Sequence, residues 1–257
     1  MSTDSLIADF AAGSGAGAFP NIKRSDVVDG LRKRVADPVT QDQGAASLCG
    51  PASFLYCLLN DQPEVYVQYV IDLYTTGKAK LGSLAISPSS DCRRYSPKPD
   101  KIAPVDWIAL ASLRDSENSV FDYESTDDTA SGITMPHSVA AWFRATGYQN
   151  VQNDTNVFFT KGRSEIDTVH HLALQGRRVC LFVNAQVIRA KPDTGRTLTP
   201  NHWVVLLSSA GVKDGKFNIT VYTWGEKKRV PGADDMEVDG FCRGFYGFVS
   251  AVYPATS

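Results

Sequence analysis

The sequence lacks the residue patterns that mark several common classes of protein. Its 257 residues include only four histidines and five cysteines, and the cysteines are scattered with no Cys-x-x-Cys pair. Neither a disulfide framework nor a zinc knuckle is therefore indicated, and a reducing compartment fits the cysteines best. No HxxH, HExxH or clustered carboxylate spacing occurs either. We therefore expect no metal site and no other cofactor.

An excess of positive charge and long hydrophobic runs are also missing. The formal net charge is −2 and the pI is near 6.1. Binding to nucleic acid needs a basic surface, so we expect no nucleic-acid partner. The longest apolar run, ASFLYCLL, ends at Asn60 and Asp61, far short of the roughly 20 apolar residues of a membrane span. We therefore expect a soluble chain without a membrane span.

The start of the chain has neither the basic region nor the long apolar core of a secretory signal peptide. Asp4 and Asp9 also argue against an organellar transit peptide. Residues 1–22 are rich in Gly, Ala and Ser, a composition typical of a flexible tail or linker. We expect little order there, followed by a single domain over residues 23–257.

Apolar residues at helical spacing predict a series of helices in the first two thirds of the chain. Residues 49–59 are nearly all apolar, as in a helix buried on most sides, and Pro51 is tolerated in its first turn. Ser25 is a suitable N-cap for one helix and Gly77 a stop signal for another. The prolines and charges of residues 87–104 indicate a long surface connection. The other expected helices span residues 24–36, 63–76, 106–118, 135–147 and 164–176.

The last third of the chain changes to strand-forming runs separated by Gly, Asp and Pro turns. These runs are residues 177–188, 201–210, 216–225 and 244–253. The sequence VKDGK, residues 212–216, predicts a hairpin connection. Because helices come first and strands afterwards, we expect an α+β fold with helices packed against an antiparallel sheet.

One cysteine stands where a nucleophile would be activated. Cys49 opens the most apolar helix, and a thiol at a helix N-terminus beside an imidazole has a lowered pKa. Gln43 lies six positions earlier in a loop of small residues. Its side-chain amide and the backbone N–H of Cys49 could together donate to a tetrahedral oxyanion.

The four histidines differ in how well they suit a catalytic role. His170 and His171 are adjacent on an expected helix and point to different faces, and His137 lies at a helix start. His202 opens an apolar strand, where a structural histidine is the ordinary explanation. Cys49 alone is equally explained as a buried helix residue. Because Gln43, Cys49 and His202 occur in the order that the chemistry needs, we favour the catalytic interpretation.

At these residues the chain resembles the papain-like cysteine peptidases. That family has a Gln-Gly pair six positions before a cysteine that begins a long central helix, then a histidine on a later strand. A further strand ends in a small polar residue followed by Trp-Gly. The matching residues here are Gln43-Gly44, Cys49, His202 and Thr223-Trp224-Gly225. The resemblance implies a papain-like fold, with a helical half whose central helix starts at Cys49 and a C-terminal antiparallel sheet.

Longer stretches are similar to a narrower group of bacterial domains. LCGPASFLYCLL, DLYTTGKAKLG and DWIALASLRDSENS look like papain-like domains of polymorphic toxins and type VI secretion effectors. This resemblance implies an antibacterial or host-directed toxin that is made in the bacterial cytoplasm and secreted without a cleaved signal peptide. It also implies two protein partners, a cognate immunity protein and a component of the secretion machine.

The residue that orients the histidine departs from the family pattern. The family has Asn or Asp at this point, whereas alignment on Trp224-Gly225 places Tyr222 there. Strand alternation groups Thr223 with Val221, Ile219 and Phe217 on one face, so its hydroxyl could face His202. We favour Thr223. Further alternatives are a Cys–His dyad without a third residue, or one of Asn218, Asp214 and Glu226.

Two classes of function agree with these motifs. The first is hydrolysis of an amide, in a protein backbone, a glutamine side chain or a cell-wall peptide, with His202 activating Cys49. The second is a binding module that keeps the scaffold of a cysteine hydrolase but has no enzymatic activity. A reactive thiol at Cys49 would distinguish the two, because a binding module needs no privileged cysteine.

Overall fold

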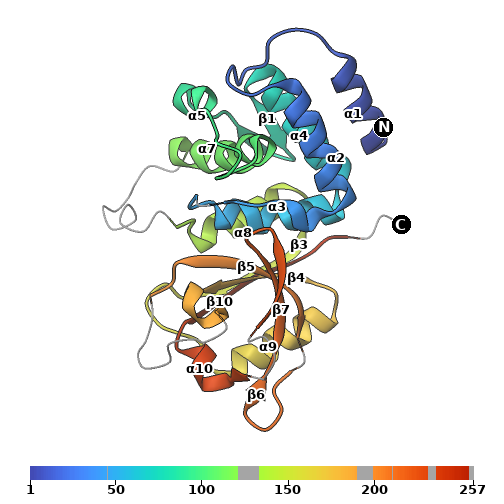
Figure 1. Ribbon diagram of the computed structural model, residues 1–257. Coiled ribbons are helices and arrows are strands. Elements are labelled where there is room, and N and C mark those ends of the chain that lie inside the picture. Colours follow the sequence, from blue (N-terminus) through green and yellow to red (C-terminus); the bar gives the residue numbers. More distant parts are fainter. Residues whose placement is uncertain (45, 121–132, 190–198, 210, 231–235, 255–257) are drawn as a thin grey trace. The chain divides into compact units, whose positions relative to one another are not determined.

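The computed structural model describes residues 1–44, 46–120, 133–189, 199–209, 211–230 and 236–254 (Figure 1). The chain divides into two compact units, Met1–Thr134 and Met135–Ser257. The first is mainly helical and the second is built on a sheet, so the expected order of helices before strands is confirmed. In the described residues, no helix combines the length and the apolar character that a membrane crossing needs.

The helices of the first unit largely follow the expected pattern. They are α1 (Thr3–Ala12), α2 (Arg24–Ala36), α3 (Cys49–Asp61), α4 (Pro63–Thr76), α5 (Ser90–Arg94), α6 (Pro104–Asp106) and α7 (Ser112–Val120). A π-helical turn, Trp107–Ala111, joins α6 to α7, and a 3-10 turn, Pro38–Thr40, follows α2. Gly77 ends α4 in the left-handed conformation at φ 75°, as expected of a glycine stop.

Residues 1–22 differ from our expectation of little order, because they contain α1. Ser2 caps this helix by accepting the N–H of Ser5 at 3.3 Å. Ile7 and Phe10, three positions apart on one face, are buried. The Phe10 ring meets Tyr74 of α4 edge to face, with centroids 5.4 Å apart. Composition suggested a linker, but Ile7 and Phe10 are buried and Arg24 donates to the carbonyl oxygen of Phe10 at 3.0 Å.

Other local features of the first unit also correct the sequence analysis. The N-cap of α2 is Lys23, without a side-chain hydrogen bond, so the expected cap at Ser25 is wrong. The surface connection at 87–104 contains α5, which Ser89 caps through the N–H of Cys92 at 3.2 Å. Two short strands, β1 (Ala79–Leu81) and β2 (Leu84–Ile86), form an antiparallel hairpin that the sequence did not reveal.

The second unit is built on a six-stranded antiparallel sheet in the order β3-β10-β4-β5-β7-β8. Its strands are β3 (Gln149–Thr155), β4 (Arg178–Val183), β5 (His202–Ser209), β7 (Ile219–Thr223), β8 (Glu226–Val230) and β10 (Phe245–Val252). The pair β6 (Lys216–Phe217) and β9 (Met236–Glu237) lies outside this sheet. The hairpin expected near 212–216 is confirmed, because Asp214 and Gly215 both have positive φ and Lys213 pairs with Lys216.

Three helices accompany this sheet: α8 (Pro136–Ala145), α9 (Arg163–Leu174) and α10 (Val238–Cys242). Residues of α9 and α10 share one core with β4, β5, β7 and β10. The core includes Ile166, Phe241, Val204 and Val221, all nearly fully buried. Val204 of β5 and Val221 of β7 belong to this core. By strand alternation, the residues two positions away on each strand point to the same face of the sheet.

Candidate active site

Cys49 is the first residue of α3, as expected. The end of a helix at which the chain enters carries a partial positive charge, which favours a negative charge on a group placed there. The next residue, Gly50, approaches Thr134 so closely that a Cβ at position 50 would overlap the Thr134 side chain. The sequence Cys-Gly-Pro therefore starts the helix with one thiol, one close-packed glycine and one proline in the first turn.

Gln43 lies in the loop that leads into α3, within the same unit. Its Nε2 atom donates to the carbonyl oxygen of Ala46 at 3.0 Å, and the N–H of Ala46 donates back to the carbonyl oxygen of Gln43 at 3.2 Å. These two bonds close a turn that holds the side-chain amide against the loop. Because a primary amide has two N–H donors, this bond engages one of them.

Position 44, directly after Gln43, requires a residue without a side chain. Its φ is +58°, a conformation that costs an L residue about 1 kcal/mol or more. A Cβ at this position would also overlap the carbonyl oxygen of Lys101. The N–H of Gly44 donates to Oδ1 of Asp42 at 2.9 Å. Close contact with the 101 segment thus fixes the path of the loop.

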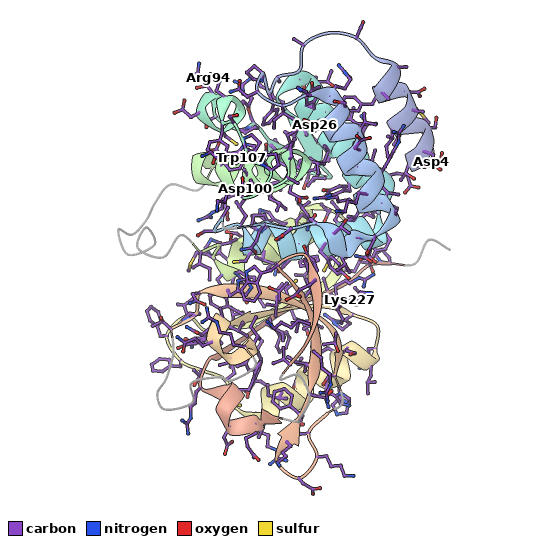
Figure 2. The ribbon with its side chains drawn as sticks, in the orientation of Figure 1. Asp4, Asp26, Arg94, Asp100, Trp107 and Lys227 are labelled. Carbon is purple, nitrogen blue, oxygen red and sulfur yellow. The ribbon has the colours of Figure 1, made fainter. Side chains whose placement is uncertain are left out.

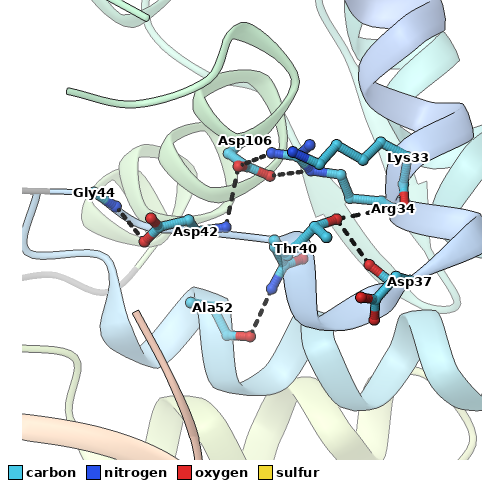
Figure 3. Close-up of polar contacts among 9 residues, drawn as sticks. Lys33, Arg34, Asp37, Thr40, Asp42, Gly44, Ala52 and Asp106 are labelled. Atoms are coloured by element: carbon cyan, nitrogen blue, oxygen red, sulfur yellow. Dashed lines mark hydrogen bonds and ion pairs between the residues drawn. The ribbon is translucent and has the colours of Figure 1, made fainter. Parts of the chain in front are cut away.

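A buried ion pair anchors the other end of this loop (Figure 3). Arg34 of α2 donates to both carboxylate oxygens of Asp106 in α6, and the Nε–Oδ1 distance is 3.1 Å. Both side chains are almost completely buried. Burial raises the pKa of Asp106, and the charge of Arg34 opposes that rise. The remaining capacity of the carboxylate is used by the backbone N–H of Asp42 at 3.1 Å.

A second anchor connects the loop to the helix that carries the thiol. Gln41 donates through Nε2 to the carbonyl oxygen of Ala52 in α3 at 2.9 Å (Figure 3). No motif in the sequence marks Arg34, Asp106 or Gln41. A buried charge reveals itself only once the fold is known, and no local pattern marks α6 as the partner of α2.

In the second unit, His202 is the first residue of β5 and pairs with Val183 of β4. Its Nε2 atom lies 2.7 Å from Oγ1 of Thr223, the last residue of β7. The register in which Val205 faces Tyr222 places Thr223 diagonal to His202 on the same face. The alternation used in the sequence analysis therefore points Thr223, and not Tyr222, at the imidazole.

The Trp224-Gly225 pair forms the tight turn between β7 and β8. Both residues have positive φ, 49° and 69°, and Thr223 pairs with Glu226 across the turn, as in a two-residue type I′ hairpin. This turn places the indole of Trp224 parallel to His202, with centroids 4.4 Å apart and an interplanar angle of 15°. The imidazole is thus held by a hydroxyl at one nitrogen and by an aromatic ring on one face.

Burial lowers the pKa of His202 to about 4, so the imidazole is neutral at pH 7. A neutral imidazole has one N–H and one acceptor nitrogen. Because Nε2 is engaged with Thr223, Nδ1 is the second ring nitrogen, which donates or accepts according to the tautomer. Of the other orienter candidates, Asp214 lies in the hairpin turn, and Oε1 of Glu226 is 4.0 Å from Nζ of Lys228.

The four expected site residues are divided between the two units. Cys49 and Gln43 belong to the first unit, and His202 and Thr223 to the second. None of the five cysteines is part of a disulfide in the structure. In the part of the chain that the structure describes, no group of three or more His, Cys, Asp or Glu side chains could hold a metal ion.

No protein-family model matches the chain, and no curated protein is significantly similar to it.

Proposed function

We propose that this chain is a papain-like cysteine hydrolase that cleaves an amide bond, with Cys49 as nucleophile and His202 as base. The observation that carries the proposal is the 2.7 Å contact between Nε2 of His202 and Oγ1 of Thr223. In many such sites a third group fixes the orientation of the base. In the other unit, Cys49 begins a helix, and the Gln43 amide in the preceding loop is hydrogen-bonded to Ala46; the proposal assigns them the roles of nucleophile and oxyanion donor.

The chemistry proceeds in two steps. If the Thr223 hydroxyl accepts Nε2–H, Nδ1 carries the lone pair and takes the thiol proton as Sγ attacks the amide carbon. Gln43 and the Cys49 N–H donate to the oxyanion. The C–N bond breaks, the amine leaves with the proton from His202, and an acyl-thioester remains. Water then attacks the thioester, releasing the acid and restoring the thiol.

The same proposal extends to the biological role. The motifs that resemble bacterial polymorphic-toxin and type VI effector domains, LCGPASFLYCLL among them, support a secreted toxin. It would be made in the bacterial cytoplasm and exported without a cleaved signal peptide, then act in a target cell on a protein or peptide-containing substrate. A cognate immunity protein and a component of the secretion machine are its proposed partners.

A non-enzymatic binding module on the same scaffold is the second candidate. One observation favours it: an N–H of the Gln43 amide already donates to Ala46 within the loop, so the oxyanion site has only its second N–H to offer. Alkylation by iodoacetamide separates the two candidates. If the chain is a hydrolase, iodoacetamide should alkylate Cys49 faster than the other cysteines. If it is a binding module, no cysteine should react faster than the others.

Toxicity tests the proposal in cells. The intact chain, Cys49→Ala and His202→Ala are expressed in the bacterial cytoplasm and, with an added export signal, in the periplasm. Cys57→Ala, a buried cysteine on the same helix, is the matched control. The proposal expects the intact chain and Cys57→Ala to kill in one compartment while the two folded site variants are harmless. Equal toxicity of all four chains would contradict it.

A further inference from the structure

A pocket of about 590 Å³ lies in the first unit beside the segment that leads into Cys49. Residues 46–48, immediately before the nucleophile, form one side of it. The other lining residues come from α5 and its flanking residues Ser89 and Tyr95, from the π-helical turn and from α7. Figure 2 labels Arg94 and Trp107 in this part of the unit. A pocket of this size accommodates a long side chain together with part of its backbone.

Two stacked aromatic rings form a wall of this pocket. The rings of Tyr95 and Trp107 are 4.1 Å apart between centroids, at an interplanar angle of 27°. Trp107 is held in place because its Nε1–H donates to the carbonyl oxygen of Cys92 at 3.0 Å. Tyr95 is 46% exposed, unusual for a large aromatic side chain. The wall therefore offers a flat apolar surface on which an aliphatic stem or a cation can lie.

The charged side chains around the wall differ in whether they have a partner of opposite charge. Arg114 is paired with Glu117 at 2.9 Å, and the exposed Asp91 with Arg94 at 3.3 Å. Asp115 differs, because its carboxylate accepts the N–H and the hydroxyl of Ser89 at 2.5 and 3.2 Å. Among the described residues it has no cationic partner.

The field of Asp115 also reaches the pocket wall. Burial, followed by the charge of Asp115, raises the pKa of the Cys92 thiol to about 12. Cys92 therefore stays neutral at pH 7 and contributes no charge of its own. The pocket thus combines an aromatic wall with one carboxylate that is bonded only to neutral donors, a combination that suits a cation on an apolar stem.

We infer that this pocket binds a basic side chain, lysine or arginine, of a peptide substrate. The stem lies along the Tyr95–Trp107 pair, and the cationic group reaches Asp115. That this peptide is the substrate rests on the proposed function, because the pocket adjoins the segment before Cys49. Binding itself requires no catalysis, so the two ideas can fail separately.

Binding is measured by calorimetry with the full chain carrying Cys49→Ala, which cannot cleave. The ligands are a capped alanine pentapeptide with a central arginine and its counterpart with citrulline, a neutral side chain of nearly the same shape. Asp115→Asn removes the charge while keeping an acceptor for Ser89. Asp29→Asn, at an exposed position on α2, is the matched charge control.

The inference expects the arginine peptide to bind at least about fivefold more tightly than the citrulline peptide. Asp115→Asn should abolish this preference and Asp29→Asn should keep it. Equal binding of the two peptides, binding of neither, or a preference that survives in Asp115→Asn would overturn the inference. If the chain shows this preference but the intact chain cleaves no amide, the inference about the pocket is supported and the proposed hydrolase activity is wrong.

Discussion

Oγ1 of Thr223 and Nε2 of His202, 2.7 Å apart, bring together the last residue of one strand and the first residue of its neighbour. A hydroxyl can either accept from Nε2–H or donate to Nε2. Only the first arrangement leaves Nδ1 able to take a proton. An amide or carboxylate oxygen at this position could only accept a hydrogen bond from Nε2–H. A threonine hydroxyl can also donate to Nε2, and in that tautomer Nδ1 carries the proton and cannot act as the base.

Thr223→Val removes the hydroxyl with little change of shape. We expect the rate of Cys49 alkylation near neutral pH to fall by up to roughly tenfold, because one hydrogen bond that orients the base is lost. Thr223→Ser should retain most of the rate, since it keeps the hydroxyl. Rates are followed by mass spectrometry of the Cys49 peptide. A valine variant as fast as the intact chain would remove Thr223 from the site.

The pKa of His202 makes stability depend on pH. Burial lowers this pKa to about 4 in the folded chain, from 6.5 in the unfolded chain. Between these values the unfolded state binds more protons, so stability rises with pH in this window and is lost as pH falls through it. The full difference is worth about 3 kcal/mol.

Urea unfolding at pH 7 and pH 4.5 tests this dependence. The intact chain should lose stability over this interval, and His202→Gln should lose distinctly less, because glutamine does not titrate. His137→Gln serves as the control, since it removes an exposed histidine in the first turn of α8 that the proposed site does not use. If His202→Gln and the intact chain lose stability equally, His202 is not the buried neutral base that the site requires.

Gly44→Ala should be the most damaging alanine substitution in the loop before Cys49. It adds backbone strain at φ +58° and an overlap with the carbonyl oxygen of Lys101. Gly176→Ala is the matched control, because its φ is +72° and no atom lies within 4 Å of the added Cβ. We expect Gly44→Ala to cost roughly 1–3 kcal/mol more than this control in urea unfolding. Equal costs would show that the loop moves freely away from the 101 segment.

Removing one charge of the buried Arg34–Asp106 pair should lower stability more than removing both. Asp106→Ala leaves a buried guanidinium without its carboxylate, at an expected cost of about 3–5 kcal/mol. Adding Arg34→Met should recover a large part of this loss, since two apolar side chains replace two charges. Asp29→Ala, which breaks the exposed pair with Arg32, should change stability little. The free energy of unfolding in urea is measured for the intact chain and these three variants. A double variant no more stable than Asp106→Ala would contradict the expected recovery.

Much of the fold could be predicted from the sequence because helical spacing and strand alternation are local signals. The helices at 24–36, 49–59 and 63–76 were found in this way, and so were the four apolar strand runs. The edge strands β3 and β8 were missed. Their sequences, QNVQNDT and EKKRV, are polar or charged, as suits strands at a sheet edge, and they carry no alternating apolar pattern.

The candidate site shows the same division between local and distant information. Cys49 and His202 were suggested by short motifs, and alternation in β7 favoured Thr223 over Tyr222 before its contact with His202 was known. The anchors of the Gln43 loop were not found, because Arg34 and Asp106 are 72 residues apart. Nothing in either neighbourhood signals that the two charges are buried together.

The most direct test of the account asks whether the thiol of Cys49 and the imidazole of His202 meet in the folded chain. A short bifunctional haloketone such as 1,3-dibromoacetone joins a thiol and an imidazole nitrogen only when both lie within the span of its three carbons. After reaction near neutral pH and proteolysis, mass spectrometry identifies the linked peptides. The account predicts a link from Cys49 to His202 that disappears in urea. Attachment at Cys49 without a link to His202, or no preference for Cys49 over Cys57, would contradict it.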